Sequence, residues 1–398
     1  MGLNDTVSAD RVHIAFFGKR NAGKSSVINA VTGQQLSVVS PVAGTTTDPV
    51  YKAMELLPLG PVVLIDTAGL DDGGALGALR VKKTQQILQK TDLAILVIDA
   101  ALGKTRQEED WIKAFEKRNI PFLTVYNKAD LCQMPTLQEG ELAVSAVTGD
   151  GIHALKEAIA ALGKPASEKA LLDGVIGAGE LAVLVTPIDS AAPKGRLILP
   201  QQQTIRALLD LGAMAMVVKE TELTGALASL REPPKLVITD SQAFHQVSSQ
   251  TPAEVWLTSF SILFARQRGD LGLVIEGVKA LDSLQDGDGI LIAEGCTHHR
   301  QCDDIGTVKL PRWIRKYTGR EPVFTFSSGR DFPEDLSAFH MVIHCGGCML
   351  NPREIQSRQG RAQAARVPIT NYGIAIAYMN GILQRSLQPF PELASMLS

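Results

Sequence analysis

The sequence from Gly18 to Ser25 reads Gly-Lys-Arg-Asn-Ala-Gly-Lys-Ser. It follows the apolar run 12–17, which predicts a buried strand, and precedes residues 26–32, which predict a helix. A glycine-rich loop in this position can curl its backbone N–H groups around phosphate, and the helix that follows adds its positive N-terminal end. The pattern therefore predicts a phosphate-binding α/β domain at the start of the chain.

Two side chains of this loop have specific expected roles. Lys24 is expected to reach the β- and γ-phosphates of a nucleotide, and Ser25 to give an oxygen ligand to Mg²⁺. The other predicted nucleotide contacts in the loop are Gly18, Asn21, Ala22, Gly23 and Ser26.

Further polar loops follow the next strands in the order that a GTPase requires. Thr46, in the loop 44–48, is expected to be the switch threonine that binds Mg²⁺, with Thr45 and Thr47 as alternatives. The strand 62–65 leads to Asp66, which would hold Mg²⁺ through water, and to Gly69, whose N–H would sense the γ-phosphate. We assign Lys24, Thr46, Asp66 and Gly69 to the hydrolytic site.

The guanine base is predicted to bind after the strand 122–126, where the sequence reads Asn127-Lys128-Ala129-Asp130. The Asp130 carboxylate can accept two hydrogen bonds from the N1 and N2 edge of guanine, a donor pair that adenine lacks, so discrimination of about 10⁴ is expected. A later loop, which would close over the base, contains Ser145, Ala146 and Val147. All these loops follow strands, as ligand loops do in open α/β sheets.

Residues 10–165 resemble the translation-factor-related GTPases of the Era and MnmE type. Leu70 stands where Ras-like proteins carry a water-orienting glutamine, so intrinsic hydrolysis is expected to be slow. Asn21 occupies the loop position that coordinates K⁺ in the potassium-activated members, and the resemblance implies that K⁺ supplies charge there. The alternative is that Asn21 only shapes the loop.

Composition limits the classes of protein that the whole chain can represent. Its 398 residues predict two or three domains. Lys and Arg total 39 against 42 acidic residues, a balance that argues against non-specific binding of nucleic acid. No apolar run approaches the roughly 20 residues of a membrane helix. Five cysteines without a signal peptide indicate reduced thiols or metal ligands, so we expect a cytoplasmic protein.

The alternation of apolar runs predicts a P-loop GTPase domain followed by two smaller α/β domains with mainly parallel sheets. We place the GTPase domain at 1–165, a dimerisation or spacer domain at 175–265 and a metal-binding domain at 266–398. The middle domain contains no cysteine and no phosphate loop. In the last domain, a single helix is predicted over 372–387.

Three cysteines follow two of the predicted strands of the last domain. Cys296 begins the sequence Cys-Thr-His298 after the strand 289–294, and His344-Cys345-Gly-Gly-Cys348 follows the strand 340–343. If the two strands are neighbours, the three thiols meet. Thiolates with nearby imidazoles suit an iron–sulfur cluster or zinc. A helix predicted to begin after Asn351 would direct its positive end toward them.

This cysteine arrangement, downstream of a complete GTPase, resembles the HydF family, the GTPases that mature FeFe hydrogenases. The resemblance implies that Cys296, Cys345 and Cys348 bind a four-iron, four-sulfur cluster whose fourth iron has an exchangeable ligand. His298 and His344 are then candidates for that ligand or for hydrogen bonding to sulfur.

The same resemblance implies the cargo and the partners. The cargo would be a diiron precursor that carries CO and CN ligands, delivered to an apo-FeFe-hydrogenase. Radical S-adenosylmethionine maturases would be further partners. We also expect a homodimer, and neither a membrane nor nucleic acid as a partner.

An alternative from another class is an RNA- or ribosome-associated GTPase with a structural zinc site. Zinc would be held by four ligands, such as the three cysteines and one histidine. A colourless protein with zinc and no sulfide would favour this reading, whereas a brown protein with iron and sulfide would favour the cluster.

Overall fold

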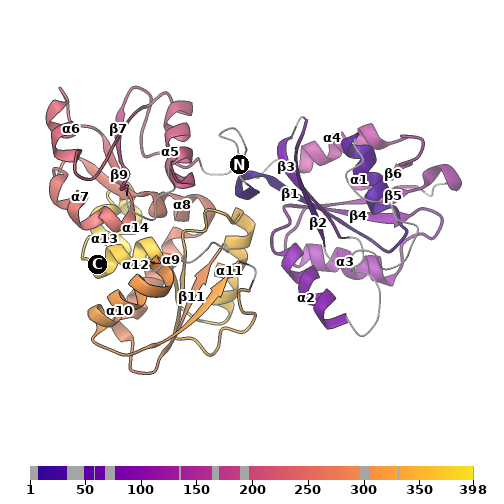
Figure 1. The fold of residues 1–398 in the computed structure, drawn as a ribbon. Coiled ribbons are helices and arrows are strands. Elements are labelled where there is room, and N and C mark those ends of the chain that lie inside the picture. The colour runs from indigo at the N-terminus through magenta and orange to yellow at the C-terminus, as the bar shows by residue number, and fades with distance from the viewer. Residues whose placement is uncertain are drawn as a thin grey trace. The chain divides into compact units, whose positions relative to one another are not determined.

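The computed structural model describes residues 8–33, 49–57, 59–67, 77–133, 136–163, 170–188, 197–295, 304–329 and 331–397. The chain divides into two compact units, Met1–Ser167 and Glu168–Ser398, drawn in Figure 1. Each unit is described by itself.

The first unit is built on a six-stranded sheet with the strand order β2-β3-β1-β4-β5-β6. Only the β2–β3 pair is antiparallel, and every other neighbouring pair is parallel. The strands are β1 (Val12–Phe17), β2 (Val50–Leu56), β3 (Gly60–Asp66), β4 (Leu93–Asp99), β5 (Phe122–Asn127) and β6 (Glu141–Val144). The helices are α1 (Lys24–Thr32), α2 (Gly77–Leu88), α3 (Arg106–Glu116) and α4 (Ile152–Leu162).

Helices cover both faces of this sheet. In β1, Ile14 and Phe16 face one hydrophobic core together with apolar residues of α1 and α4. The alternate residues Ala15 and Phe17 face a second core that includes Phe115 of α3. Because both faces are covered, β1 is apolar on both faces apart from the buried His13, rather than alternating between apolar and polar residues.

The second unit holds two four-stranded sheets, both entirely parallel, with the orders β10-β9-β7-β8 and β12-β11-β13-β14. The half with β7–β10 is called the middle module, and the half with β11–β14 the C-terminal module. The strands are β7 (Leu181–Val185), β8 (Met214–Val218), β9 (Leu236–Thr239), β10 (Trp256–Ser259), β11 (Gly289–Glu294), β12 (Val323–Ser328), β13 (Met341–His344) and β14 (Ile369–Asn371). The fold class predicted from the sequence, a P-loop domain followed by further parallel α/β structure, is confirmed.

Ten α-helices lie within the described residues of this unit. They are α5 (Leu199–Asp210), α6 (Leu223–Ser229), α7 (Phe244–Gln250), α8 (Phe260–Arg268), α9 (Leu271–Val278), α10 (Leu310–Thr318), α11 (Pro352–Ala364), α12 (Tyr372–Met379), α13 (Leu383–Ser386) and α14 (Pro391–Ala394).

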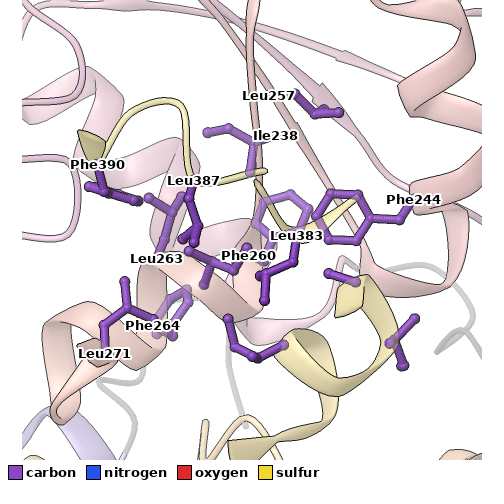
Figure 2. Close-up of a cluster of buried hydrophobic side chains, with 14 of the residues drawn as sticks. Ile238, Phe244, Leu257, Phe260, Leu263, Phe264, Leu271, Leu383, Leu387 and Phe390 are labelled. Atoms are coloured by element: carbon purple, nitrogen blue, oxygen red, sulfur yellow. The ribbon is translucent and has the colours of Figure 1, made fainter. Parts of the chain in front are cut away.

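One hydrophobic core joins the two modules. It contains residues of the middle sheet such as Ile238, residues of α8 such as Leu263, and residues near the end of the chain such as Leu383 and Leu387 (Figure 2). The C-terminal segment therefore returns to the middle module, and α13 packs against β10. Helix α8 belongs to this common core and contacts β10 of the middle module and α11 and α12 of the C-terminal module.

The predicted single helix over 372–387 is wrong. The chain forms α12 and α13 instead, and the break contains Gly381 with a φ of 69°. A residue in the left-handed region ends an α-helix, and glycine adopts it without the steric cost of a Cβ atom. The short strands β10 and β14 were not predicted, because each mixes apolar with polar residues and lacks the apolar run that marked the equally short β13.

Gly277 of α9 offers a test of this packing. A Cβ atom at this position would lie 2.1 Å from the carbonyl oxygen of Ile369 in β14. We expect Gly277→Ala to lower the free energy of unfolding of the second unit by about 1–3 kcal/mol, because helix and strand must separate. Chemical denaturation followed by circular dichroism measures the change.

Gly360 of α11 is the matched control, because a Cβ atom there would meet nothing within 4 Å. Gly360→Ala should raise stability by up to about 1 kcal/mol, the difference in helix propensity. Equal stabilities of Gly277→Ala and the wild type would contradict the close approach of α9 and β14.

Candidate nucleotide site and candidate metal centre

The phosphate loop has the backbone that its glycines suggested. Gly18 has a φ of 135°, and a Cβ atom there would lie 2.0 Å from the carbonyl oxygen of Val97, so only glycine fits. The buried Lys24 turns back on the loop, where its Nζ donates to the carbonyl oxygens of Gly18 and Lys19. Those carbonyls hold the ammonium group beside the loop in which phosphate is expected to bind.

Two of the predicted Mg²⁺ ligands lie together. The Ser25 hydroxyl at the start of α1 donates to the Asp66 carboxylate at the end of β3, with an oxygen–oxygen distance of 2.7 Å. The parallel pairing of Phe16 with Asp66 places both groups at one edge of the sheet. Hard oxygen ligands at such spacing suit Mg²⁺. Other predicted switch residues lie outside the described residues: Thr45, Thr46, Thr47 and Gly69.

Asn127 connects the phosphate loop to the loop predicted to close over the base. Its buried side chain donates from Nδ2 to the carbonyl oxygen of Ala22 at 3.0 Å, and its Oδ1 accepts from the Ala146 N–H at 3.1 Å. Ser145 is also buried, whereas the Val147 side chain is exposed. The sequence suggested a base contact for Asn127 but gave no sign of this joining role.

The other base-binding residues follow β5 directly. Lys128 has a φ of 66°, and its Nζ lies 2.6 Å from Asp99 Oδ2. The exposed Asp130 lies in the next turn, free of the sheet. Asn21 also adopts a left-handed backbone, with a φ of 63°.

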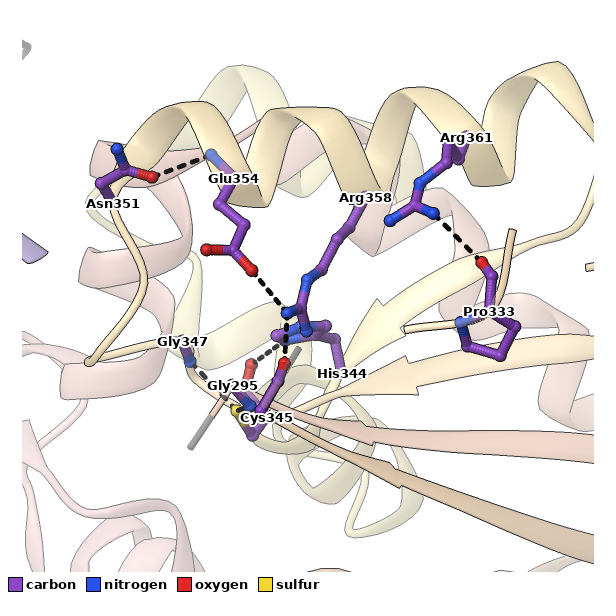
Figure 3. A network of polar contacts seen from close by, with 10 residues as sticks. Gly295, Pro333, His344, Cys345, Gly347, Asn351, Glu354, Arg358 and Arg361 are labelled. Carbon is purple, nitrogen blue, oxygen red and sulfur yellow. Dashed lines mark hydrogen bonds and ion pairs between the residues drawn. The ribbon is translucent and has the colours of Figure 1, made fainter. Parts of the chain in front are cut away.

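The two cysteine-bearing loops begin side by side in the C-terminal module. Strands β11 and β13 are parallel neighbours, with Ala293 opposite His344. The Cys345 sulfur accepts hydrogen bonds from the N–H of Gly295, at 3.0 Å, and of Gly347, at 3.4 Å (Figure 3). The first bond crosses between the two loops, so the backbone that leads to Cys296 passes the Cys345 sulfur.

The Cys345 side chain is half-buried. Burial raises its pKa to about 11, although the hydrogen bonds from Gly295 and Gly347 lower it in part. Without a metal the thiol is therefore protonated at neutral pH. A metal that binds the thiolate must displace this proton, so uptake of metal releases protons.

His344 has both ring nitrogens engaged. Its Nδ1 lies 2.7 Å from the Cys345 carbonyl oxygen, and its Nε2 lies 2.9 Å from a guanidinium nitrogen of Arg358. Burial, and then the charge of Arg358, lower the His344 pKa to about 3. Because Arg358 can only donate, Nε2 accepts and Nδ1–H donates to the carbonyl. In this structure the ring thus joins the Cys345 backbone to Arg358.

Arg358 of α11 is a residue of this site that the sequence analysis missed. Its buried guanidinium donates to the Gly329 carbonyl oxygen and to Glu354 Oε1, both at 2.7 Å, and lies over the Phe332 ring. Asn351 caps the same helix by accepting from the Glu354 N–H (Figure 3). The only sequence signal was the i, i+4 spacing of Glu354 and Arg358, which is common on any helix.

The two described cysteines of the C-terminal module, Cys345 and Cys348, fit a soft metal. Cys345 and Cys348 lie on one loop, and N–H donors directed at sulfur are suited to thiolate ligands of an iron–sulfur cluster. Cys296 and His298 lie outside the described residues. Within the described ranges, therefore, no group of three or more potential ligands is assembled. Nor does the described part of the chain contain a helix long and apolar enough to span a membrane.

Comparison with known proteins places the first unit among GTPases. Residues 13–128 match the sequence model of the 50S ribosome-binding GTPase family. The tRNA modification GTPase MnmE of Xanthomonas campestris pv. campestris (strain B100) is 34% identical over 186 residues, which cover 46% of this chain and 39% of that protein. GTPase Der of Kosmotoga olearia is 38% identical over 127 residues, covering 31% and 28% of the two chains. The chain spans less than half the length of either relative.

Among solved structures, an Era variant of Aquifex aeolicus bound to GDP and AlF4⁻ matches with 20% identity and a TM-score of 0.35. The match covers 52% of this chain and 93% of that one.

The second unit matches two further models that meet near the end of α8. Residues 171–269 match the hydrogen maturase F dimerization domain, and residues 272–389 match the hydrogen maturase F tetramerization domain. These two matches follow the GTPase match along the chain. The chain belongs to the hydrogen maturase F (HydF) family and begins with an Era/MnmE-type GTPase domain that binds GTP and Mg²⁺.

Proposed function

We propose that this hydrogenase-maturation GTPase is a scaffold that carries a four-iron, four-sulfur cluster on Cys296, Cys345 and Cys348. Three cysteines leave one iron of such a cluster without a protein thiolate. When bound, the cluster would supply an iron with an exchangeable ligand, to which a diiron precursor with CO and CN ligands can attach. The precursor is then transferred to an apo-FeFe-hydrogenase.

The hydrogen bond from Gly295 N–H to the Cys345 sulfur is the observation that carries this proposal. It supports a site in which the loops after β11 and β13 contribute to one metal centre. Amide donors stabilise thiolate charge and raise the reduction potential of iron–sulfur clusters.

Other residues of this chain would hold the site in shape. His344 and Arg358 fix the Cys345 carbonyl, and Asn351 starts a helix whose positive end lies shortly after Cys348. A helix N-terminus favours negative charge, including that of thiolates. These groups orient the ligands without having to contact the metal.

Nucleotide state is proposed to control partners rather than cluster chemistry. GTP would order the switch loops through γ-phosphate and Mg²⁺ contacts. That ordering would bias the release of the hydrogenase or of the radical S-adenosylmethionine maturases. The names of the two matched domains support an oligomer, in which the middle module forms the dimer contact.

The metal content tests the central proposal. After anaerobic reconstitution, the wild-type chain should be brown and contain about four irons and four sulfides. Cys345→Ala and Cys348→Ala should each lose most of this iron, because each removes a ligand. Metal analysis, sulfide analysis and electron paramagnetic resonance (EPR) provide the measurements.

Cys132→Ala is the matched control, because Cys132 belongs to the GTPase unit and should leave the metal content unchanged. A wild-type chain that holds zinc without sulfide, or no metal at all, would contradict the proposal.

Potassium dependence tests the proposed role of Asn21. GTP hydrolysis should be at least about tenfold faster in KCl than in NaCl at equal ionic strength, because K⁺ supplies charge to the transition state. Asn21→Ala should abolish the difference while fluorescent GDP still binds. Turnover that is equal in both salts for the wild type would refute the K⁺ role.

Partner affinity tests the proposed effect of nucleotide. The dissociation constants of apo-hydrogenase and of the maturases should differ between the GTP-bound and GDP-bound chain, measured by surface plasmon resonance. Lys24→Ala, which removes a predicted phosphate contact, should remove the difference. Identical affinities in both nucleotide states of the wild type would exclude control by GTP.

A further inference from the structure

Arg268 is one of the largest side chains that are almost fully buried among the described residues, with 2% of its surface exposed. It is the last residue of α8 and lies within the dimerization-domain match. Burial of a guanidinium is unfavourable unless hydrogen-bond partners replace the water that it loses. The position of Arg268 therefore depends on the groups that surround it.

Those groups belong mainly to the loop that carries Cys348. Arg268 Nη1 lies 3.0 Å from the Gly347 carbonyl oxygen, 2.9 Å from that of Cys348 and 3.0 Å from that of Leu350. One guanidinium nitrogen thus hydrogen-bonds to three carbonyl oxygens of a single turn. Since C=O and N–H point in opposite directions across a trans peptide, this also fixes which way the N–H groups of the turn point.

The base of this contact is packed against the middle module. Phe264, one turn earlier on α8, lies in the common hydrophobic core (Figure 2). Its ring centroid is 5.0 Å from the guanidinium carbon of Arg268. Nη2 of Arg268 lies 3.4 Å from Gln203 Oε1 on α5 of the middle module. Arg268 therefore extends from the middle module and contacts the cysteine loop of the C-terminal module.

The chain directly after Arg268 is also held. The Asp270 N–H donates to Gln359 Oε1 of α11 at 2.9 Å. At Gly269 a Cβ atom would lie 2.6 Å from the same oxygen, so the approach is close. The cysteine loop therefore has two supports. Arg268 binds its carbonyls, and α11, which begins shortly after Cys348, holds its end. Gln359 in turn connects α11 to the turn between α8 and α9.

We propose that Arg268 is a positioning residue for the metal centre: from the middle module it fixes the backbone of residues 347–350 and thereby the sulfur of Cys348. Cys345 is supported by β13 and by His344, whereas Arg268 binds three carbonyls of the turn that carries Cys348. This inference rests on the proposed function, because the metal centre is the cluster site proposed above.

The test compares Arg268→Met, which removes the charge and all donors, with Arg268→Lys, which keeps the charge but loses the planar fork. In the reconstituted protein, Arg268→Met should lose iron to a chelator at least about tenfold faster than the wild type. A factor of this size corresponds to the free energy of one charge-assisted hydrogen bond. Its reduced cluster should give a shifted or broadened EPR signal. Arg268→Lys should restore part of both properties.

Arg266→Met is the matched control on the same helix. Arg266 donates to the Asp173 carbonyl oxygen at 2.8 Å and lies over the Phe390 ring, so its loss removes a similar side chain that serves other partners. Its chelation rate and EPR signal should equal those of the wild type. A second measurement, hydrogen–deuterium exchange of residues 345–350 in metal-free protein, should be faster in both Arg268 variants only.

Unchanged chelation rates and EPR signals in both Arg268 variants would overturn the assignment, as would equal changes in Arg266→Met. If the wild-type chain itself takes up no iron, the proposed function fails instead. Hydrogen exchange then decides whether Arg268 holds the loop: faster exchange in its variants supports this, and equal exchange overturns it.

Discussion

The parallel pairing of β11 with β13 is the constraint on which the C-terminal module depends. It places Ala293 opposite His344, so that the residues after each strand begin at the same edge of the sheet. The Cys345 N–H then continues the ladder to Ala293, and its sulfur receives the Gly295 N–H. A slip of one residue in this register would turn every side chain of β13 to the other face and separate the two loops.

The first unit uses the same geometry for different chemistry. There the pairing of β1 with β3 brings Ser25 to Asp66, and the loop after β5 supplies Asn127. In both units the functional groups follow the carboxyl ends of parallel strands, where such sheets bind ligands. Glycines allow the close approaches: Gly18 lies against the Val97 carbonyl, and Gly347 has a φ of 63° beside Ile355.

Two buried arginines organise the backbone of the cysteine loop from opposite modules. Arg358 holds His344, which holds the Cys345 carbonyl, while Arg268 holds the carbonyls that follow. Desolvating a guanidinium is costly, and it is offset here by several charge-assisted hydrogen bonds to carbonyls. The consequence is a loop whose shape is set by α8 and α11. Because α8 belongs to the core shared by both modules, the middle module contacts the loop that carries Cys345 and Cys348 directly, through Arg268.

The sequence by itself determined the fold class and the candidate residues of both sites. The phosphate loop, the guanine motif and the two parts of the cysteine motif are short, and each follows an apolar run, so the fold class could be predicted from neighbouring residues alone and candidate residues could be named for each site. Tertiary structure decided which distant groups support them. Arg268 is 79 residues from Gly347, and Asn127 is 105 residues from Ala22, so no local pattern links them. Packing likewise joined the two modules into one core and broke the last long helix at Gly381. Such features arise from long-range contacts and backbone dihedral angles, which hydrophobic periodicity does not report.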